Sequence, residues 1–486
     1  MYGSRTNFGV VAYFTGIAMV WFAGLQIFPV IMALIYCEPQ IRIFEMSALF
    51  YMLTGITLVY LFRNFKQPVS KRQGQFCVSF LWLFLPVAGA FPYMFFAGEF
   101  SLTDCFFESF SGFTTTGSTV VEKFSDLPKC LLCYRSLTQW VGGLGFTVLI
   151  ISVLSDYPGN LNNLFSSEFF YLGLGRIYPR IGTTVRRILL IYCSLTLLCF
   201  LLLYSGSMNV CEALCHAFST VSTGGFSTSA NSLADFDSYS QWVVMCFMFL
   251  SGISFFLIVY LFQGRFKLVF NNEQLKYYVL LIVTVSICFV VYWSLRWEPA
   301  TWAEKIKDSL FYSVSIVSST GYNPSLKTPG VFVSACLLIL MFVGGCSASS
   351  ASGVKVIRVL ILFRYAGTAL TKIFHPNAIV PVRYNKKSVS DEDLRAVFGF
   401  FFLYLAVFMV GIFALCCAGN GFSSSMVMSA ANLGNIGPMA LQYTGSVSCS
   451  SISEVSRLIL IILMLLGRLE IYTFVAVFSK SLYKTR

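Results

Sequence analysis

Charged residues are scarce in this chain of 486 residues, which carries 33 Lys and Arg, 21 Asp and Glu and only two His. The four charged types make up 11% of the sequence, whereas hydrophobic residues make up 57% and the mean hydropathy is +0.76. Soluble domains of this total length need far more charge on their surfaces. The composition therefore excludes a soluble protein and predicts an integral membrane protein.

The residues that usually carry catalysis or bind metals are also in short supply. His216 and His375 lie far apart in the sequence, and Cys130-x-x-Cys133 has no second pair at the spacing of a zinc site. Most of the sixteen cysteines lie in apolar runs, where a thiol acts as a small hydrophobic group. Because no nucleophile has an evident base, we expect no enzyme activity. Disulfides are chemically feasible among Cys37, Cys105, Cys130, Cys211 and Cys449, but the sequence does not fix their pairing.

Basic residues gather in alternate connections between the apolar runs. No Lys or Arg occurs between Ser205 and Arg265, or between Arg395 and Arg457. Because cytoplasmic loops carry an excess of Lys and Arg, we place the basic connections and both termini in the cytoplasm. This sidedness accounts for most of the net charge of +12 and leaves no need for a nucleic acid partner.

Four turns rich in Thr, Ser and Gly interrupt the apolar sequence. They are Phe113–Ser118, Val221–Gly225, Val317–Tyr322 and, more distantly, Gly434–Pro438. The segments before them, such as Asp104–Phe113 and Asp308–Val317, are too short to span a bilayer, so we expect half-helices that enter the membrane and return. Broken backbone at membrane depth is tolerated only next to protein or a water-filled cavity. The four turns therefore predict a common interior.

A unit of helix, short segment, turn and second helix recurs four times after two leading helices at 8–36 and 43–63. The second helices carry similar short motifs at Trp140–Gly143, Phe249–Gly252, Phe342–Gly345 and Leu465–Arg468. We predict an all-α polytopic membrane protein with about ten transmembrane helices and four re-entrant pore helices in a pseudo-fourfold arrangement. The predicted boundaries are 1–75 for the leading helices and basic linker, then 76–155, 156–264, 265–390 and 391–486 for the four pore repeats.

The short segments have acids at their amino ends, namely Asp104, Glu212 and Asp308. Acids there complement the helix dipole, and the negative carboxyl ends then point toward the common axis, which suits a cation. Rings of backbone carbonyls with Thr or Ser hydroxyls can replace the water shell of a dehydrated cation. Glycine lets the backbone adopt conformations closed to other residues. These features predict a cation filter at the four turns.

The order of the turns and three further motifs resemble the TrkH/KtrB (Trk/Ktr/HKT) superfamily of potassium transporters over nearly the whole chain. The motifs are Trp140–Gly145, Gly344–Cys346 followed by Val354–Arg358, and Gly467–Glu470. The two leading helices make the chain more similar to TrkH than to KtrB. The resemblance implies potassium uptake across the bacterial inner membrane, with potassium as the transported ion and no organic cofactor. It also implies a homodimer and cytoplasmic nucleotide-binding regulatory subunits of the TrkA type.

The resemblance assigns the potassium filter residue by residue. The filter pairs are Thr116-Gly117, Thr223-Gly224, Thr320-Gly321 and Ile436-Gly437, with Thr115 and Asn435 adjoining them. Related plant transporters with serine at the first turn tend toward sodium, so a glycine in every turn favours potassium.

A run of eight small residues, Cys346–Gly353, lies within the second helix of the third repeat. Ser and Gly weaken a helix and favour a break, although close packing between helices is the alternative. In the resembled family the matching segment is an intramembrane loop that obstructs permeation below the filter. The expected gate residues are Gly345, Cys346, Ser347, Ser349, Ser350, Gly353 and Arg468. Ser and Ala stand here where TrkH-like sequences usually have several glycines.

Arg468 interrupts an apolar helix, where a charge costs on the order of 3 kcal/mol on insertion scales. The nearest acid, Glu470, is two residues away and so does not face it on a helix. Arg468 is expected either beside the small-residue loop as part of the gate, or in a salt bridge to another helix.

Eight basic residues lie between Lys355 and Arg395, and we expect this stretch to contact anionic lipid or the regulatory subunits. They are Lys355, Arg358, Arg364, Lys372, Arg383, Lys386, Lys387 and Arg395, with Arg176, Arg180, Arg186 and Arg187 as further candidates. The alternative function is an ion-coupled secondary transporter, a sodium- or proton-linked potassium symporter. Such a transporter would need intramembrane carboxylates, and the inner halves of the helices offer few beyond Glu470.

Overall fold

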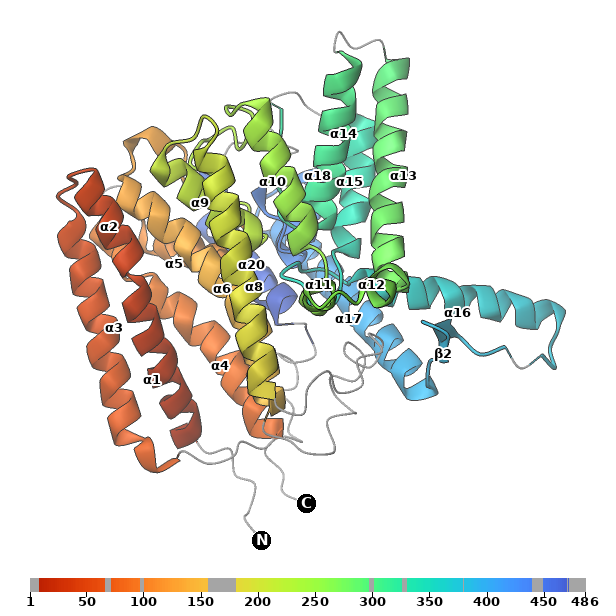
Figure 1. Ribbon diagram of the computed structural model, residues 1–486, viewed down its shortest axis with the longest axis horizontal. Helices are drawn as coiled ribbons and strands as arrows, with labels where there is room; N and C mark the ends of the chain where they lie inside the picture. Colours follow the sequence, from red (N-terminus) through yellow and green to blue (C-terminus); the bar gives the residue numbers. More distant parts are fainter. Residues whose placement is uncertain are drawn as a thin grey trace.

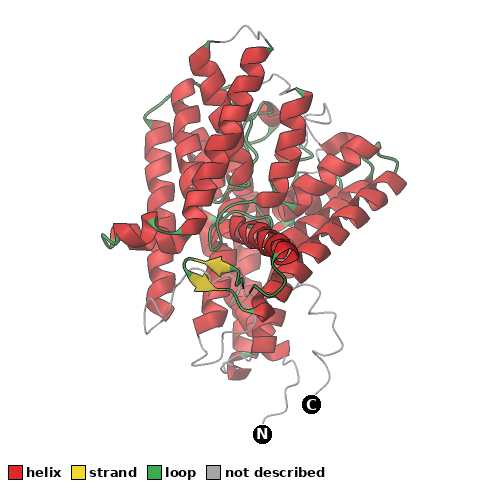
Figure 2. Ribbon diagram, turned by 90° about the vertical axis from the view of Figure 1, so that its right-hand side faces the viewer, coloured by secondary structure: helices red, strands yellow, loops and turns green. Residues whose placement is uncertain are grey.

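The computed structural model describes residues 8–65, 71–96, 100–155, 181–296, 301–325, 330–378, 380–438, 449–469 and 471. Side chains at 65, 71–75, 144–155 and 181–185 lie outside this description. Figure 1 shows one helical bundle from which helix α16 (Val356–Phe374) projects sideways. In the described ranges, strand occurs only in a small antiparallel hairpin of β1 (Arg383–Tyr384) and β2 (Lys387–Ser388), which packs on α16 (Figure 2). The predicted all-α architecture is confirmed.

The leading helices form one edge of the bundle (Figure 1). They are α1 (Phe8–Leu25), α2 (Ile27–Ile35) and α3 (Ile41–Leu61). The chain turns at Gln26 inside the predicted 8–36 helix, yet α1 and α2 together form one apolar span of 28 residues. Helices α1 and α3 cross closely at Gly16 and Gly55. A Cβ built on Gly16 would lie 2.8 Å from the Gly55 carbonyl oxygen.

Each repeat contains an outer helix, a short pore helix and an inner helix. The outer helices are α4 (Lys71–Gly89), α8 (Ile181–Tyr204), α13 (Glu273–Leu295) and α17 (Asp391–Cys417). The pore helices are α5 (Leu102–Phe113), α9 (Val210–Val221), α14 (Trp302–Val317) and α18 (Phe422–Leu433). The inner helices are α6 (Lys129–Ser155), the pair α10 (Ser238–Ser251) and α11 (Phe255–Phe262), α15 (Val331–Val343) and α20 (Glu454–Arg468). Helix α12 (Phe266–Phe270) and 3-10 turns at Arg63–Phe65, Pro92–Phe95, Phe124–Asp126 and Cys449–Ser451 complete the described elements.

Six described helices are long and apolar enough to cross a membrane, or seven if the bent pair α10 and α11 is one span. This count covers only the residues that the structure describes, so it sets no total against the prediction of about ten transmembrane helices. The second inner helix bends by 98° between α10 and α11, and the third, α15, has 13 residues and ends at Val343. The first, α6, continues for 27 residues.

Three pore helices begin with a capping box. In this motif the N-cap side chain accepts a hydrogen bond from the N3 amide, and the N3 side chain accepts one from the N-cap amide. The acids are Asp104 in α5, Glu212 in α9 and Glu304 in α14. The prediction of Asp308 for the third helix is wrong, because α14 begins at Trp302 and Glu304 is its N3 residue. Pore helix α18 begins after Gly421 and has no side-chain cap.

All sixteen cysteines are free thiols, so none of the feasible disulfides forms. Cys211 and Cys215 lie one helical turn apart, with their sulfur atoms 3.9 Å from each other. Most thiols are buried among apolar side chains, in keeping with a packing role.

Candidate functional site

All four pore helices end in the same backbone motif. In α5, the amide of Thr116 donates to the Ser111 carbonyl and that of Thr115 donates to Gly112, each at 2.9 Å. Both bonds recur in the other three turns. The outer bond runs from the amides of Gly224, Thr320 and Ile436 to the carbonyls of Ser219, Ser315 and Ala431. The inner bond runs from the amides of Thr223, Ser319 and Asn435 to the carbonyls of Thr220, Ile316 and Asn432. This is the Schellman cap, which satisfies the last carbonyls of a helix. The motif places the four turns in one structural register.

The residue that follows the C-cap of each pore helix has a left-handed backbone conformation, although it is not glycine. The φ angles are +54° at Thr115, +56° at Thr223, +58° at Ser319 and +53° at Asn435. A residue held in this region costs about 1–3 kcal/mol and persists only where its surroundings enforce it. Four such residues at equivalent positions therefore mark a backbone that the fold holds in a specific shape.

The structure shifts the register of the second turn by one residue. Glycines with φ of +83°, +80° and +85° follow the turns at Gly117, Gly225 and Gly321. Gly225 rather than Gly224 thus matches Gly117, and Gly224 occupies the position of Thr116. The predicted pair Thr223-Gly224 missed this, because the sequence has two adjacent glycines and only the backbone conformation distinguishes them.

The four turns close into a ring. A Cβ built on Gly117 would lie 2.2 Å from the Gly224 carbonyl oxygen, and one on Gly225 would lie 2.0 Å from that of Thr320. In the same direction, a Cβ on Gly321 would lie 2.8 Å from the Ile436 carbonyl oxygen. The amide of Gly437 completes the circuit by donating to the Thr116 carbonyl at 2.7 Å.

Equivalent carbonyls therefore alternate with glycines around one centre. The carbonyls belong to Thr116, Gly224, Thr320 and Ile436, and the glycines are Gly117, Gly225, Gly321 and Gly437. Any side chain at a glycine would collide with the next turn, since real Cβ contacts essentially never fall below 3.0 Å. The predicted filter residues are thus brought together, and Gly225 and Ser319 join them.

Buried side chains hold the turns from behind. The Ser111 hydroxyl donates to the Ser118 carbonyl at 2.6 Å, and the equivalent Ser315 donates to Tyr322 at 2.8 Å. Gln139 of α6 donates to the Gly224 carbonyl at 2.8 Å and accepts from the Phe226 amide at 3.2 Å.

Glu108 and Arg135 form a fully buried ion pair beside the first turn. The Arg135 Nε lies 2.9 Å from a Glu108 carboxylate oxygen, and the two side chains are 1% and 0% exposed. Glu108 also accepts from the Thr119 hydroxyl at 2.5 Å and from the Val120 amide at 2.7 Å. The sequence interpretation missed this pair, although a charge within each of two apolar segments was the signal that could have identified it.

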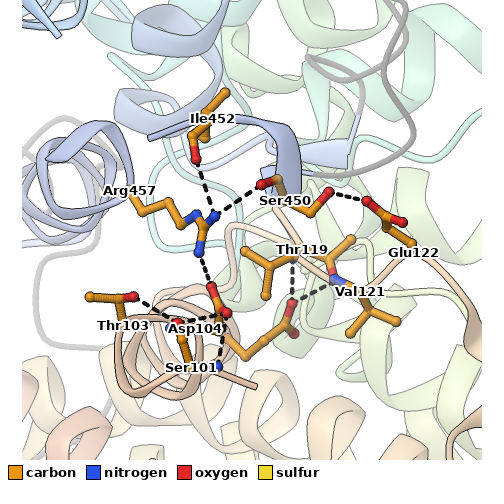
Figure 3. Close-up of polar contacts among 11 residues, drawn as sticks. Ser101, Thr103, Asp104, Thr119, Val121, Glu122, Ser450, Ile452 and Arg457 are labelled. Carbon is orange, nitrogen blue, oxygen red and sulfur yellow. Dashed lines mark hydrogen bonds and ion pairs between the residues drawn. The ribbon is translucent and has the colours of Figure 1, made fainter. Parts of the chain in front are cut away.

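A second ion pair joins the first and fourth repeats at the start of α5 (Figure 3). Arg457 of α20 pairs with Asp104 of α5 and donates to the carbonyls of Ser450 and Ile452 at 2.9 and 3.1 Å. Figure 3 also shows Ser450 bonded to Glu122. The last repeat is therefore fastened to the first near the start of its pore helix.

The small-residue run forms a loop rather than a helix between α15 and α16. Its backbone has positive φ at Gly344, Ala348 and Gly353. The Ser350 hydroxyl donates to the carbonyls of Val221 and Ser251 at 3.2 Å. The alternative of continuous close helix packing is wrong for this segment, because its polar groups bond to other elements instead.

The loop lies directly against two of the four turns. The amide of Ser352 donates to the hydroxyl of Ser319, the left-handed residue of the third turn, at 2.8 Å. Val221, which binds Ser350, is the last residue of pore helix α9. The Cys346 amide bonds to Gly252 at 3.0 Å, so the loop also contacts the break between α10 and α11.

Arg468 connects this loop to the first repeat. Its Nη1 donates to the Ser350 carbonyl and the Ser352 hydroxyl, both at 3.0 Å, and its Nη2 donates to the Gly142 carbonyl at 3.1 Å. The side chain is buried, with its guanidinium 5.5 Å from the centre of the Trp82 ring. Of the two expected positions, Arg468 occupies the one beside the loop, whereas Glu470 lies outside the described residues.

The recurring glycines of the inner helices allow close approach to the pore helices. A Cβ on Gly142 would lie 2.0 Å from the carbonyl oxygen of Phe113, the last residue of α5. A Cβ on Gly467 would lie 2.1 Å from that of Leu433, the last residue of α18. The predicted sequence motif thus marks where an inner helix packs against the end of a pore helix.

Only some of the basic side chains between Lys355 and Arg395 are exposed at the surface. Lys355 and Arg358 are 2% and 7% exposed, and the Arg358 guanidinium lies 4.0 Å from the centre of the Phe400 ring. Arg364 is half-buried and pairs with Glu273 at 2.7 Å. The exposed members are Lys372, Arg383, Lys386, Lys387 and Arg395, whereas Arg176 and Arg180 lie outside the described residues.

These features define a class of protein, namely a helical membrane protein in which four re-entrant turns of one chain close a ring around a common axis. The chain belongs to the TrkH family, described as cation transport proteins, whose family model matches residues 39–485.

Individual relatives match almost from end to end. The Trk system potassium uptake protein TrkH of Escherichia coli strain K12 is 32% identical over 98% of this chain and 100% of its own length. A protein of the same name from Halomonas elongata is 30% identical, covering 96% of this chain and 98% of its own. The crystal structure of the potassium transporter TrkH from Vibrio parahaemolyticus superposes with a TM-score of 0.89 at 28% identity, covering 98% of this chain and 100% of that one.

Proposed function

We propose that this chain takes up potassium through the ring of four turns. The observation that carries the proposal is the closed circuit of carbonyls at Thr116, Gly224, Thr320 and Ile436, each against the next turn. Such carbonyls can replace the hydration shell of a cation that enters the ring. The pore helices direct their negative carboxyl ends at the same place, which favours a positive charge there. The names of the relatives, potassium uptake proteins, support potassium as that cation.

The loop from Gly345 to Gly353 is proposed as the gate of this pathway. It contacts the second and third turns through Ser350 and Ser352 on the side of the inner helices, so an ion leaving the ring meets it next. Arg468 holds the same segment through two hydrogen bonds and adds a buried positive charge that opposes a passing cation. Movement of the loop would then control flux.

Assembly and sidedness belong to the same proposal. We place the protein in the bacterial inner membrane with both termini in the cytoplasm, following the distribution of Lys and Arg. Cytoplasmic nucleotide-binding subunits of the TrkA type would bind the exposed basic residues around the hairpin, such as Lys386 and Lys387, and the chain would act as a homodimer.

Coupled symport receives less support. It calls for an intramembrane carboxylate that can gain and lose a proton or bind a second ion. Glu108, a buried carboxylate in a pore helix, already accepts hydrogen bonds from Thr119, Val120 and Arg135. Its oxygens are therefore committed to holding the turn.

The test is rescue of a bacterium that lacks its own potassium uptake systems, at low external potassium. The chain is expressed with and without a TrkA-type regulatory subunit, and growth and rubidium uptake are measured. Uptake that depends on the chain in at least one condition is the expected result. Absence of uptake in both conditions, with the protein present in the membrane, would overturn the proposal.

A further inference from the structure

A side chain of the fourth turn reaches into the ring. A Cβ built on Gly117 or Gly321 would lie 2.9 Å from Cδ of Pro438, and one on Gly225 would lie 2.9 Å from its Cγ. The pyrrolidine ring of Pro438 is thus against the glycines of all three other turns.

The order of the turns places that ring on the axis. Turns one and three are the neighbours of turn four in the circuit of contacts, whereas turn two, which contains Gly225, lies diagonally opposite. A side chain from turn four that contacts Gly225 as well as Gly117 and Gly321 must extend across the centre. Pro438 therefore fills the centre of the ring at the level of the glycines.

The backbone of the fourth turn explains how Pro438 comes to lie there. Gly437 has no positive φ, unlike its three equivalents. The first three turns thus share one glycine conformation, and the fourth turn, where proline follows the glycine, departs from it.

The hydrogen bond of Gly437 differs as well. The amides of Gly117 and Gly321 point back to their own pore helices, at 3.5 Å from Ser111 and 3.2 Å from Ser315, but Gly437 donates across to Thr116. The backbone of the fourth turn is therefore bonded to the neighbouring first turn at this point, whereas the first and third turns are bonded to their own pore helices.

We propose that Pro438 is the outer constriction of the cation pathway and that the fourth turn is its moving part. This inference rests on the proposed function. Cγ and Cδ of proline offer no ligand to a cation, so an ion passes only when the side chain withdraws. Withdrawal also breaks the bond from Gly437, so that the Thr116 carbonyl of the ring becomes free to bind a cation as the axis opens.

Two variants of the full-length protein test the proposal in the uptake-deficient strain, with the regulatory subunit present. Pro438→Ala removes Cγ and Cδ, the atoms that contact the glycines, so we expect the initial rate of rubidium uptake to rise about threefold or more. Pro438→Cys puts a thiol on the axis, where the membrane-impermeant cationic reagent MTSET, added outside the cells, should abolish uptake. Potassium at high concentration should slow this block.

The controls use the same face of the molecule. Ala230→Cys places a thiol at an exposed position beyond the second turn, and its modification should leave uptake unchanged, as should MTSET on the unmodified chain. Labelling with a biotinylated thiol reagent confirms that each cysteine reacts.

The results separate this inference from the proposed function. If the unmodified chain gives no rubidium uptake, the proposed function fails. If the unmodified chain transports, the inference is overturned when labelled Pro438→Cys keeps full uptake. Should Pro438→Cys fail to reach the membrane, Pro438→Ala decides, and an unchanged or lower rate overturns the inference.

Discussion

At the scale of single residues, the candidate filter combines backbone strain with side chains that enforce it. Thr115, Thr223 and Ser319 hold left-handed conformations, which are uncommon for residues other than glycine and rarest for β-branched ones such as threonine. Ser111, Ser315 and Gln139 fix the segments that follow by hydrogen bonds to backbone groups. The first three turns, held this way, lose little entropy when a cation binds to their carbonyls, because their shape is already set.

Gly117→Ser should lower the preference for potassium over sodium. The new Cβ would lie 2.2 Å from the Gly224 carbonyl oxygen, so the ring must distort and its fit to the larger ion is lost. We expect the ratio of potassium to sodium permeability to fall about tenfold, which corresponds to about 1.4 kcal/mol. Gly264→Ser is the matched control, because Gly264 has a φ of +71° but no atoms near its missing Cβ. An unchanged ratio in Gly117→Ser would refute this filter assignment.

Breaking the buried pair of Glu108 and Arg135 should destabilise the protein strongly. Either Glu108→Gln or Arg135→Met leaves one uncompensated charge among apolar groups, and we expect a loss of about 3–5 kcal/mol in the free energy of unfolding. The double variant should cost less than the sum of the two. Unfolding in detergent micelles measures the effect. Arg364→Met, in a half-buried pair with Glu273, serves as the control and should cost about 1 kcal/mol or less; equal losses in all variants would contradict the argument.

At the scale of elements, the inner helices depart most from regular transmembrane helices where they pack around the ring of turns. Glycines let α6 and α20 approach the ends of pore helices, whereas the second inner helix bends between α10 and α11. The loop after α15 satisfies its polar groups on neighbouring elements, as irregular backbone at membrane depth must. An element held by a few side-chain hydrogen bonds can exchange them for others, which suits a gate.

Arg468→Ala should raise flux in the absence of the regulatory subunit. The substitution removes three hydrogen bonds that hold the loop and helix α6 together, and it removes a positive charge from below the ring. Charged hydrogen bonds contribute about 1.5–3 kcal/mol each, so we expect basal rubidium uptake to increase by about tenfold or more.

Arg468→Lys separates charge from geometry. Lysine keeps the charge but lacks the planar fork that reaches the loop and Gly142 together, so it should give an intermediate increase. Flux and regulation that stay unchanged in Arg468→Ala would exclude this residue from the gate.

At the scale of the whole molecule, a ring made from one chain needs a join between its first and last repeats. Gly437 and Asn435 provide it at the filter, with bonds of 2.7 and 2.8 Å to the backbone and side chain of Thr116. Asp104 and Arg457 provide it at the start of α5 (Figure 3). These contacts join residues more than three hundred positions apart and close the circuit.

The pair of Asp104 and Arg457 should show a clear coupling energy. A double-mutant cycle with Asp104→Ala and Arg457→Ala, read from unfolding in detergent, is expected to give about 1–3 kcal/mol. The partners are 12% and 15% exposed, so solvent screens them little. The more separated pair of Lys307 and Asp308, at 3.7 Å within one helix, should give a coupling near zero. Coupling of similar size in both pairs would contradict a special role for the join.

The sequence by itself determined the membrane class, the repeated plan and the location of the turns. These follow from local composition, because apolar runs, short segments and clusters of Thr, Ser and Gly need no knowledge of partners. The same reasoning identified the small-residue loop. It misplaced the start of α14 at Asp308, because it did not use the capping-box pattern of Thr301 and Glu304 that begins this helix.

Only the tertiary structure decided which residues meet. The register of Gly225, the burial of Lys355, the partners of Arg468 and the position of Pro438 all depend on contacts between segments distant in sequence. A turn of Thr and Gly has the same local sequence whether it ends a helix or lines a pore. It became part of a ring because three other turns, brought together by close packing of their helices, placed their carbonyls and glycines against it.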